Sequence, residues 1–187
     1  MAKNTDAKAE LPILKIGKLD AAKRQLETAI RLWLFSGEPV SIHTLAAAAH
    51  QVLHDFGKRR GVPSILRDSQ NIRPEYEKRV HELFYRYETF FKHANKDPDA
   101  LLEFKPGATE VFILDAVLTY ENLTREAVPI FTTFKAWMFI QKPELMKEEQ
   151  GEKIIQIIKN CGGNPLHIPK TEFFTRLQSI LMKQGID

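Results

Sequence analysis

The sequence predicts an all-α protein, a compact helical bundle of about seven helices with a short extended N-terminal arm. Apolar residues recur at steps of three and four along most of the 187 residues, and no stretch alternates polar and apolar residues as strands do. Glycine and proline interrupt this pattern near residues 37–39, 61–63, 95–107 and 161–169. An apolar fraction of 43% and a charged fraction of 27% are typical of globular proteins.

The first residues differ from the rest of the chain. Residues 1–10 are polar and charged, which predicts a disordered tail. LPILKIG, residues 11–17, predicts a short extended arm that packs on the body. From Leu19 the apolar spacing becomes helical and continues until Gly37 and Pro39 end the first helix.

The second predicted helix carries three histidines. Ser41 is its expected N-cap and Gly61 its expected stop, so the helix runs to about Arg60. At 100° per residue it has an apolar face and an opposite face that we expect to meet solvent. The apolar face holds Leu45, Ala48, Ala49, Val52 and Phe56, and the opposite face holds His43, Ala47, His50 and His54.

A third helix is expected from about Arg73, with Pro74 in its first turn, to Ala94. Its apolar stripe is Val80, Leu83, Phe84, Tyr87, Phe90, Phe91 and Ala94. A connection at 96–107 follows, with four further helical patterns at about 108–122, 125–141, 148–160 and 170–184. We expect one domain over 11–187, made of a first half (11–95), the connection, and an additional helical layer (108–187).

Composition restricts the cellular context. The single Cys161 cannot form an internal disulfide, and the N-terminus lacks the apolar stretch of a signal peptide, which favours a cytoplasmic protein. The most apolar stretch, 127–141, contains Pro129 and Lys135, so no membrane span is expected. A net charge of +3 does not by itself indicate nucleic-acid binding. The sequence contains no glycine-rich phosphate loop, and we expect no cofactor.

LHDFGK, residues 53–58, contains the His-Asp pair found in metal-dependent phosphohydrolases. His54 and Asp55 would supply that pair and Asp115 a later carboxylate, but the required earlier histidine on a separate helix is missing. His50 and His54 are spaced i, i+4 and could present two imidazoles to one metal. A metal site of His50, His54 and Asp55 is therefore one alternative, and an ordinary solvent-facing helix surface is the other.

A second constellation lies on the third helix. Arg86 and His93 are seven residues apart, two helical turns, so both side chains emerge on one side, beside the apolar stripe. Arginine offers paired donors to phosphate oxygens, and histidine exchanges protons near neutral pH. These two groups are the minimum for metal-independent RNA cleavage through attack by the RNA's own 2′-hydroxyl. The alternative is structural, with Arg86 paired to Glu82 and His93 placed near a helix C-terminus.

The chain over residues 17–95 resembles the HEPN superfamily of helical bundles. The resemblance rests on LDAAKRQLETAIRLWLFSGEPVSIHTLAAAAHQVL followed later by Arg86, six intervening residues and His93. It implies a ribonuclease site formed by paired Arg-His motifs at a homodimer interface, or a module that has lost activity and binds RNA or a protein partner. Self-association could also use the apolar stretch 130–139 if that helix is half covered. A non-catalytic scaffold bundle and an HD-type phosphohydrolase are the competing hypotheses.

Overall fold

The computed structural model describes residues 13–64, 67–68, 74–95, 97–142 and 168–183. These residues contain helices and no strand, so the predicted all-α class is confirmed. The described part holds six helices rather than about seven, and the expected helix at 148–160, the tail 1–10 and Cys161 lie outside it. The helices are α1 (Lys18–Leu34), α2 (Pro39–Arg60), α3 (Pro74–Lys92), α4 (Gly107–Thr124), α5 (Pro129–Gln141) and α7 (Lys170–Lys183).

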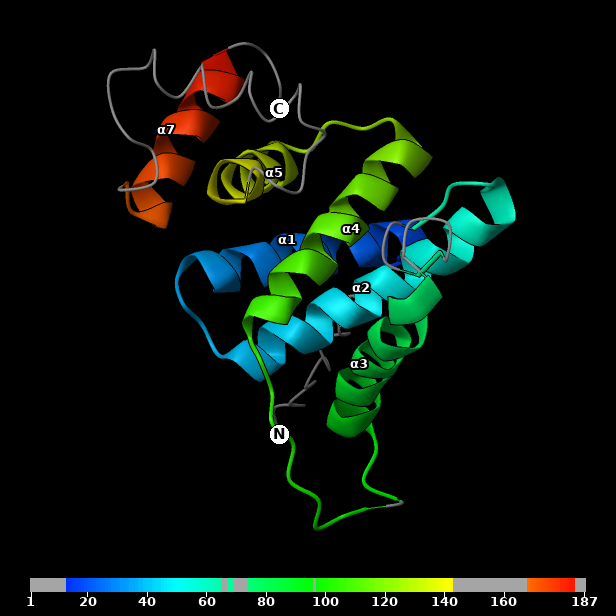
Figure 1. Ribbon diagram of the computed structural model, residues 1–187. Coiled ribbons are helices and arrows are strands. Elements are labelled where there is room, and N and C mark those ends of the chain that lie inside the picture. The colour runs from blue at the N-terminus through cyan, green and yellow to red at the C-terminus, as the bar shows by residue number, and fades with distance from the viewer. Residues whose placement is uncertain (1–12, 65–66, 69–73, 96, 143–167, 184–187) are drawn as a thin grey trace, which may run out of the picture.

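The helix α2 is the centre of the bundle. It packs against α1, α3 and α4, while α5 packs against α4, α1 and α7. Figure 1 shows α5 and α7 at one end of the molecule and α3 at the other, with α1, α2 and α4 between them. None of the described helices has both the length and the apolar character needed to cross a bilayer.

The start of α2 differs from the prediction. The N-cap is Glu38 rather than Ser41, and its carboxylate accepts hydrogen bonds from the backbone N–H groups of Val40, at 3.0 Å, and Ser41, at 2.7 Å. Pro39 occupies the first turn, where its missing N–H is not needed. Gly61 ends the helix as predicted, with a left-handed φ of 68°.

The prediction that the histidine face of α2 meets solvent is wrong for most of that face. His43 and His50 are buried, at 0% and 1% exposure, and Ala47 is also buried. The expected apolar face is only half-buried at Leu45, Ala48, Val52 and Phe56. The reason is that α2 is covered on several sides, and the buried imidazoles have polar partners on α4 that a single-helix pattern does not show.

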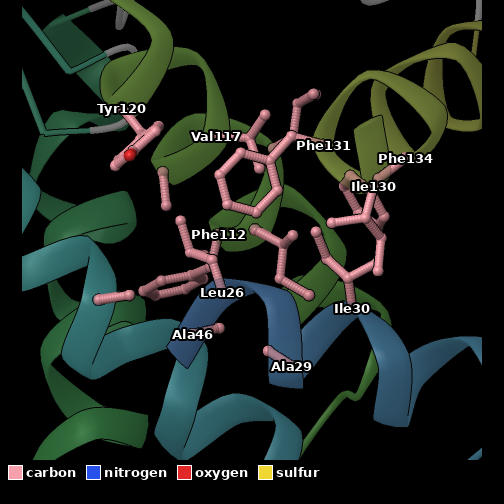
Figure 2. Packing of buried hydrophobic residues seen from close by; sticks show 14 of the residues in the cluster. Leu26, Ala29, Ile30, Ala46, Phe112, Val117, Tyr120, Ile130, Phe131 and Phe134 are labelled. Carbon is pink, nitrogen blue, oxygen red and sulfur yellow. The ribbon is translucent and has the colours of Figure 1, made fainter. Parts of the chain in front are cut away.

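One hydrophobic core joins both halves of the chain. It combines side chains of α1 and α2 with those of α4, α5 and α7, including Leu26, Phe112, Phe131 and Phe174. Figure 2 shows Phe131 of α5 directed toward Val117 of α4, above Leu26 and Ile30 of α1. In the apolar stretch 130–139 the side chains of Phe131, Phe134 and Met138 are buried in this core, and those of Trp137 and Phe139 are partly buried against it, so a role of this helix in self-association stays a prediction.

The N-terminal arm is also placed differently from its prediction. Residues 13–17 precede α1 without helical structure, but all five are exposed, so this part of the arm does not pack on the body. Ile13 and Leu14 are 89% and 72% exposed. The helix that follows buries the side chains that the sequence periodicity indicated, among them Leu26, Ile30 and Trp33.

Candidate RNA-binding groove on helix α3

The helix α3 is positioned by an aromatic contact with α2 and by the connection that follows it. Tyr87, in its C-terminal half, is buried, at 2% exposure, and its ring lies edge-on to His43. The Tyr87 hydroxyl donates to the carbonyl of Glu103, at 3.5 Å, and accepts from the N–H of Lys105, at 3.4 Å. Tyr87 therefore fixes the returning connection against the same helix that carries Arg86 and His93.

A groove of about 860 Å³ lies between α3 and this connection. Its wall on α3 spans from Glu82 to His93, and its other wall includes Asp97 and the segment 100–102. The volume is in the range of about 300–1,000 Å³ that small-molecule sites commonly have. The connection extends beyond the end of α3 before it returns to α4 (Figure 1).

Arg86 and His93 both line this groove, as the two-turn spacing indicated. Both side chains are exposed, so a ligand in the groove can reach them. Seven residues of helix separate their Cα atoms by about 10 Å along the axis, a distance that the long arginine side chain can shorten. Among the described ion pairs Glu82 contacts Lys78, at 3.9 Å, rather than Arg86.

The groove is lined by both charged and apolar groups. Arg86 provides a cation and His93 an imidazole, and Glu82 and Asp97 bring two carboxylates. Tyr85 contributes an aromatic ring that is 54% exposed, with the Arg67 guanidinium 5.7 Å from its centre. Such a lining can hold one planar base and one phosphate group, but it is too mixed in charge for a general polyanion site.

Arg67 links α3 to α2. Its guanidinium hydrogen-bonds to Gln51 of α2 and pairs with Glu88 of α3 at 3.3 Å, while its backbone N–H donates to the Ser64 hydroxyl at 3.1 Å. Glu88 also pairs with Lys92, at 2.7 Å. The side chains of Arg67 and Glu88 are only 6% and 13% exposed, which strengthens their electrostatic interaction relative to a surface pair.

A separate buried cluster joins α2, α4 and the segment after α2. Asp115 Oδ2 lies 2.5 Å from His50 Nε2 and accepts a hydrogen bond from the Ser64 hydroxyl at 2.6 Å. His50 and Asp115 are 1% and 2% exposed. Because a buried ion or hydrogen-bonded pair is costly to break, this cluster fixes the position of Ser64 and, through it, of Arg67.

The metal alternative would require His50, His54 and Asp55 to converge. His50 instead faces Asp115, and the exposed Asp55 accepts a hydrogen bond from Gln51 at 3.0 Å. Partial burial, with the Arg67 charge as a smaller cause, lowers the pKa of His54. Within the described ranges no group of three or more histidine, cysteine, aspartate or glutamate side chains is arranged to hold a metal ion.

His43 is enclosed by aromatic rings. Tyr87, Phe91, Phe104 and Phe112 surround its imidazole with centroid distances of 4.9–5.7 Å. Nδ1 hydrogen-bonds to the Thr109 hydroxyl at 2.9 Å, and Nε2 has no hydrogen-bond partner among the described residues. Burial lowers the pKa of His43 to about 4, so the ring is neutral near pH 7. Two smaller effects act in opposite directions, since the Glu88 charge raises this pKa and the Lys92 charge lowers it.

Comparison with known proteins assigns no function to these residues. No protein-family model, no curated protein and no solved structure matches the chain. The functional interpretation therefore rests on the residues themselves.

Sequence reasoning identified two side chains of the groove and missed its other wall. Arg86 and His93 were found by their helical spacing, whereas Asp97, Leu101 and Leu102 reach the groove because the connection folds back along α3. Arg67 was also missed, because it lies outside any helix and has no periodic pattern around it. Its position four residues after Pro63 gave no signal of its contacts with α2 and α3.

Proposed function

We propose that the protein binds single-stranded RNA in the groove beside α3 and cleaves it without a metal ion, using Arg86 and His93. The observation that carries this proposal is that a cation on α3, Arg86, and an imidazole two turns later, His93 directly after the end of the helix, line the same open groove. The guanidinium supplies paired donors to a phosphodiester, and the exposed imidazole supplies a group that accepts and donates protons near neutral pH.

The reaction follows from the roles of these two groups. His93 accepts the proton of a ribose 2′-hydroxyl, and the 2′-oxygen attacks the adjacent phosphorus. Arg86 stabilises the negative charge that develops on the phosphoryl oxygens. The bond from phosphorus to the 5′-oxygen breaks, and that oxygen takes a proton from the imidazolium. The products are a 2′,3′-cyclic phosphate and a 5′-hydroxyl, with no change in the protonation of His93 over the full cycle.

Two substitutions test this proposal directly. Arg86→Ala and His93→Ala each remove one group, and we expect cleavage of a labelled RNA to fall by a factor of about 10² or more. Both side chains are exposed, so the helical circular-dichroism signal should not change. Lys78→Ala is the matched control, because it removes an exposed cation on the same helix from outside the groove. Cleavage that survives both groove substitutions would contradict the proposal.

A non-catalytic interaction module is the second candidate. It is favoured by the apolar and acidic character of the connection, where Leu101 is 97% exposed and Asp97 and Asp99 are exposed beside it. Exposed apolar and acidic groups of this kind can contact a protein ligand. This candidate predicts that wild-type protein shows no RNA turnover but forms a defined complex through the groove.

A further inference from the structure

The exposed apolar side chains of the described residues include two groups that complement each other. One is the segment 13–18, the described part of the arm together with Lys18 at the start of α1, where Ile13, Leu14 and Ile16 are 89%, 72% and 48% exposed. The other is the groove, where Leu101 is almost fully exposed beside Leu102 and Phe90. Exposed apolar groups of this size are costly to leave in water, so each group favours an occupant.

The arm and the acidic side of the groove carry opposite charges. The arm has the sequence ILKIGK, with two lysines and no carboxylate. The groove is lined by two carboxylates, Glu82 of α3 and Asp97 of the connection, beside the Arg86 guanidinium. Asp99 and Glu103 add two carboxylates to the same connection outside the lining. The two lysines of the arm can thus pair with the carboxylates, and its aliphatic side chains can pack against the leucines of the groove.

Their lengths also match. The α3 wall of the groove runs from Glu82 to His93, eleven residues, which is about 17 Å at the helical rise. Six extended residues of the arm span about 20 Å. In the structure the arm of the same chain is exposed and does not fill its own groove, so the occupant that fits comes from another molecule.

We propose that residues 13–18 of one copy bind the groove beside α3 of a second copy, and that the reciprocal contact produces a dimer by exchange of arms. The arm then covers Arg86 and His93 of its partner. In this dimer each groove is covered by the partner's arm, and RNA binding requires the arm to leave. This last consequence rests on the proposed function, whereas the association itself does not.

The test measures the mass of the native particle by light scattering over a dilution series, without RNA. Wild-type protein should be a dimer at the highest concentrations. Leu14→Asp in the arm and Leu101→Asp in the groove should each weaken association by about tenfold or more, which corresponds to about 1.4 kcal/mol. Phe35→Asp is the matched control, because Phe35 is 74% exposed but belongs to neither the arm nor the groove.

Mixing the two variants separates arm exchange from other modes of dimerisation. A one-to-one mixture of Leu14→Asp and Leu101→Asp retains one intact arm and one intact groove, so it should form heterodimers while each variant alone remains monomeric. A monomeric wild type, variants that dimerise as the wild type does, or a mixture without heterodimers would each overturn the proposal.

A binding measurement with RNA then distinguishes this proposal from the proposed function. At concentrations where the wild type is dimeric, Leu14→Asp should bind a single-stranded RNA more tightly than the wild type does. If no form binds RNA while the mass results hold, the RNA function fails and the arm exchange stands. If the wild type and Leu14→Asp bind RNA equally tightly, the proposal that the arm covers the groove is refuted.

Discussion

Replacing His43 should remove part of the protein's sensitivity to acid. Burial among four aromatic rings lowers the pKa of His43 to about 4 from its ordinary value of 6.5, so the folded protein binds this proton less readily than the unfolded chain does. The stabilising contribution is present above pH 6.5 and is lost as the pH falls toward 4. Between pH 7 and pH 5 the loss is about 2 kcal/mol, and it approaches roughly 3 kcal/mol at lower pH.

Urea denaturation at pH 7 and pH 5 measures this effect. His43→Gln keeps a group that can hydrogen-bond to Thr109 but cannot titrate, so its free energy of unfolding should fall by about 2 kcal/mol less than that of the wild type over this interval. His43→Phe provides a second non-titrating variant if the first is unstable. His93→Gln, which removes an exposed imidazole, is the matched control. Equal pH dependence in wild type and both His43 variants would refute the reasoning.

Two further substitutions, each with a matched control, test the packing around α2 by the same urea measurement. Gly57→Ala should destabilise the fold by about 1–3 kcal/mol, because a Cβ there would lie 2.5 Å from the backbone oxygen of Val62. Gly107→Ala, where a Cβ meets nothing within 4 Å, should be nearly neutral, and equal losses would refute the steric argument. Asp115→Ala should cost about 3 kcal/mol by leaving His50 and Ser64 without their shared acceptor. Asp115→Asn, which retains an acceptor for Ser64, should cost less, and an equal loss would show that this hydrogen bond is unimportant.

The helices were predictable because they depend on local spacing. The apolar periodicity after Leu19, the stop at Gly61 and the position of Pro74 in a first turn all agree with the structure. The start of α2 was missed because a glutamate at the N-cap is less common than a serine, although its carboxylate makes the same hydrogen bonds here.

The environment of the histidines could not be obtained from the sequence. His50 meets Asp115 across 65 positions of the chain, and His43 meets Thr109 across 66. A wheel drawn for α2 alone assigns these imidazoles to the face opposite the apolar stripe, which is correct as geometry. Only the packing of α3 and α4 on that face determines that it is buried.

For the groove, too, the sequence predicted only the part that depends on local helical spacing. Helical spacing placed Arg86 and His93 on one side of α3, because that relation depends on a period of 3.6 residues. The second wall depends on the return of the connection, which is set by the contact of Tyr87 with Glu103 and Lys105. No local pattern in residues 96–107 predicts that return.

The most direct test of the proposed chemistry compares two oligonucleotides of the same sequence in the presence of a chelator. One is RNA, and the other has deoxyribose at every position, so it lacks the attacking 2′-hydroxyl. We predict that wild-type protein cuts the RNA, leaving a 2′,3′-cyclic phosphate, and leaves the deoxy oligonucleotide intact. An intact RNA, or cleavage of both oligonucleotides, would contradict the assignment of Arg86 and His93 to metal-independent RNA cleavage.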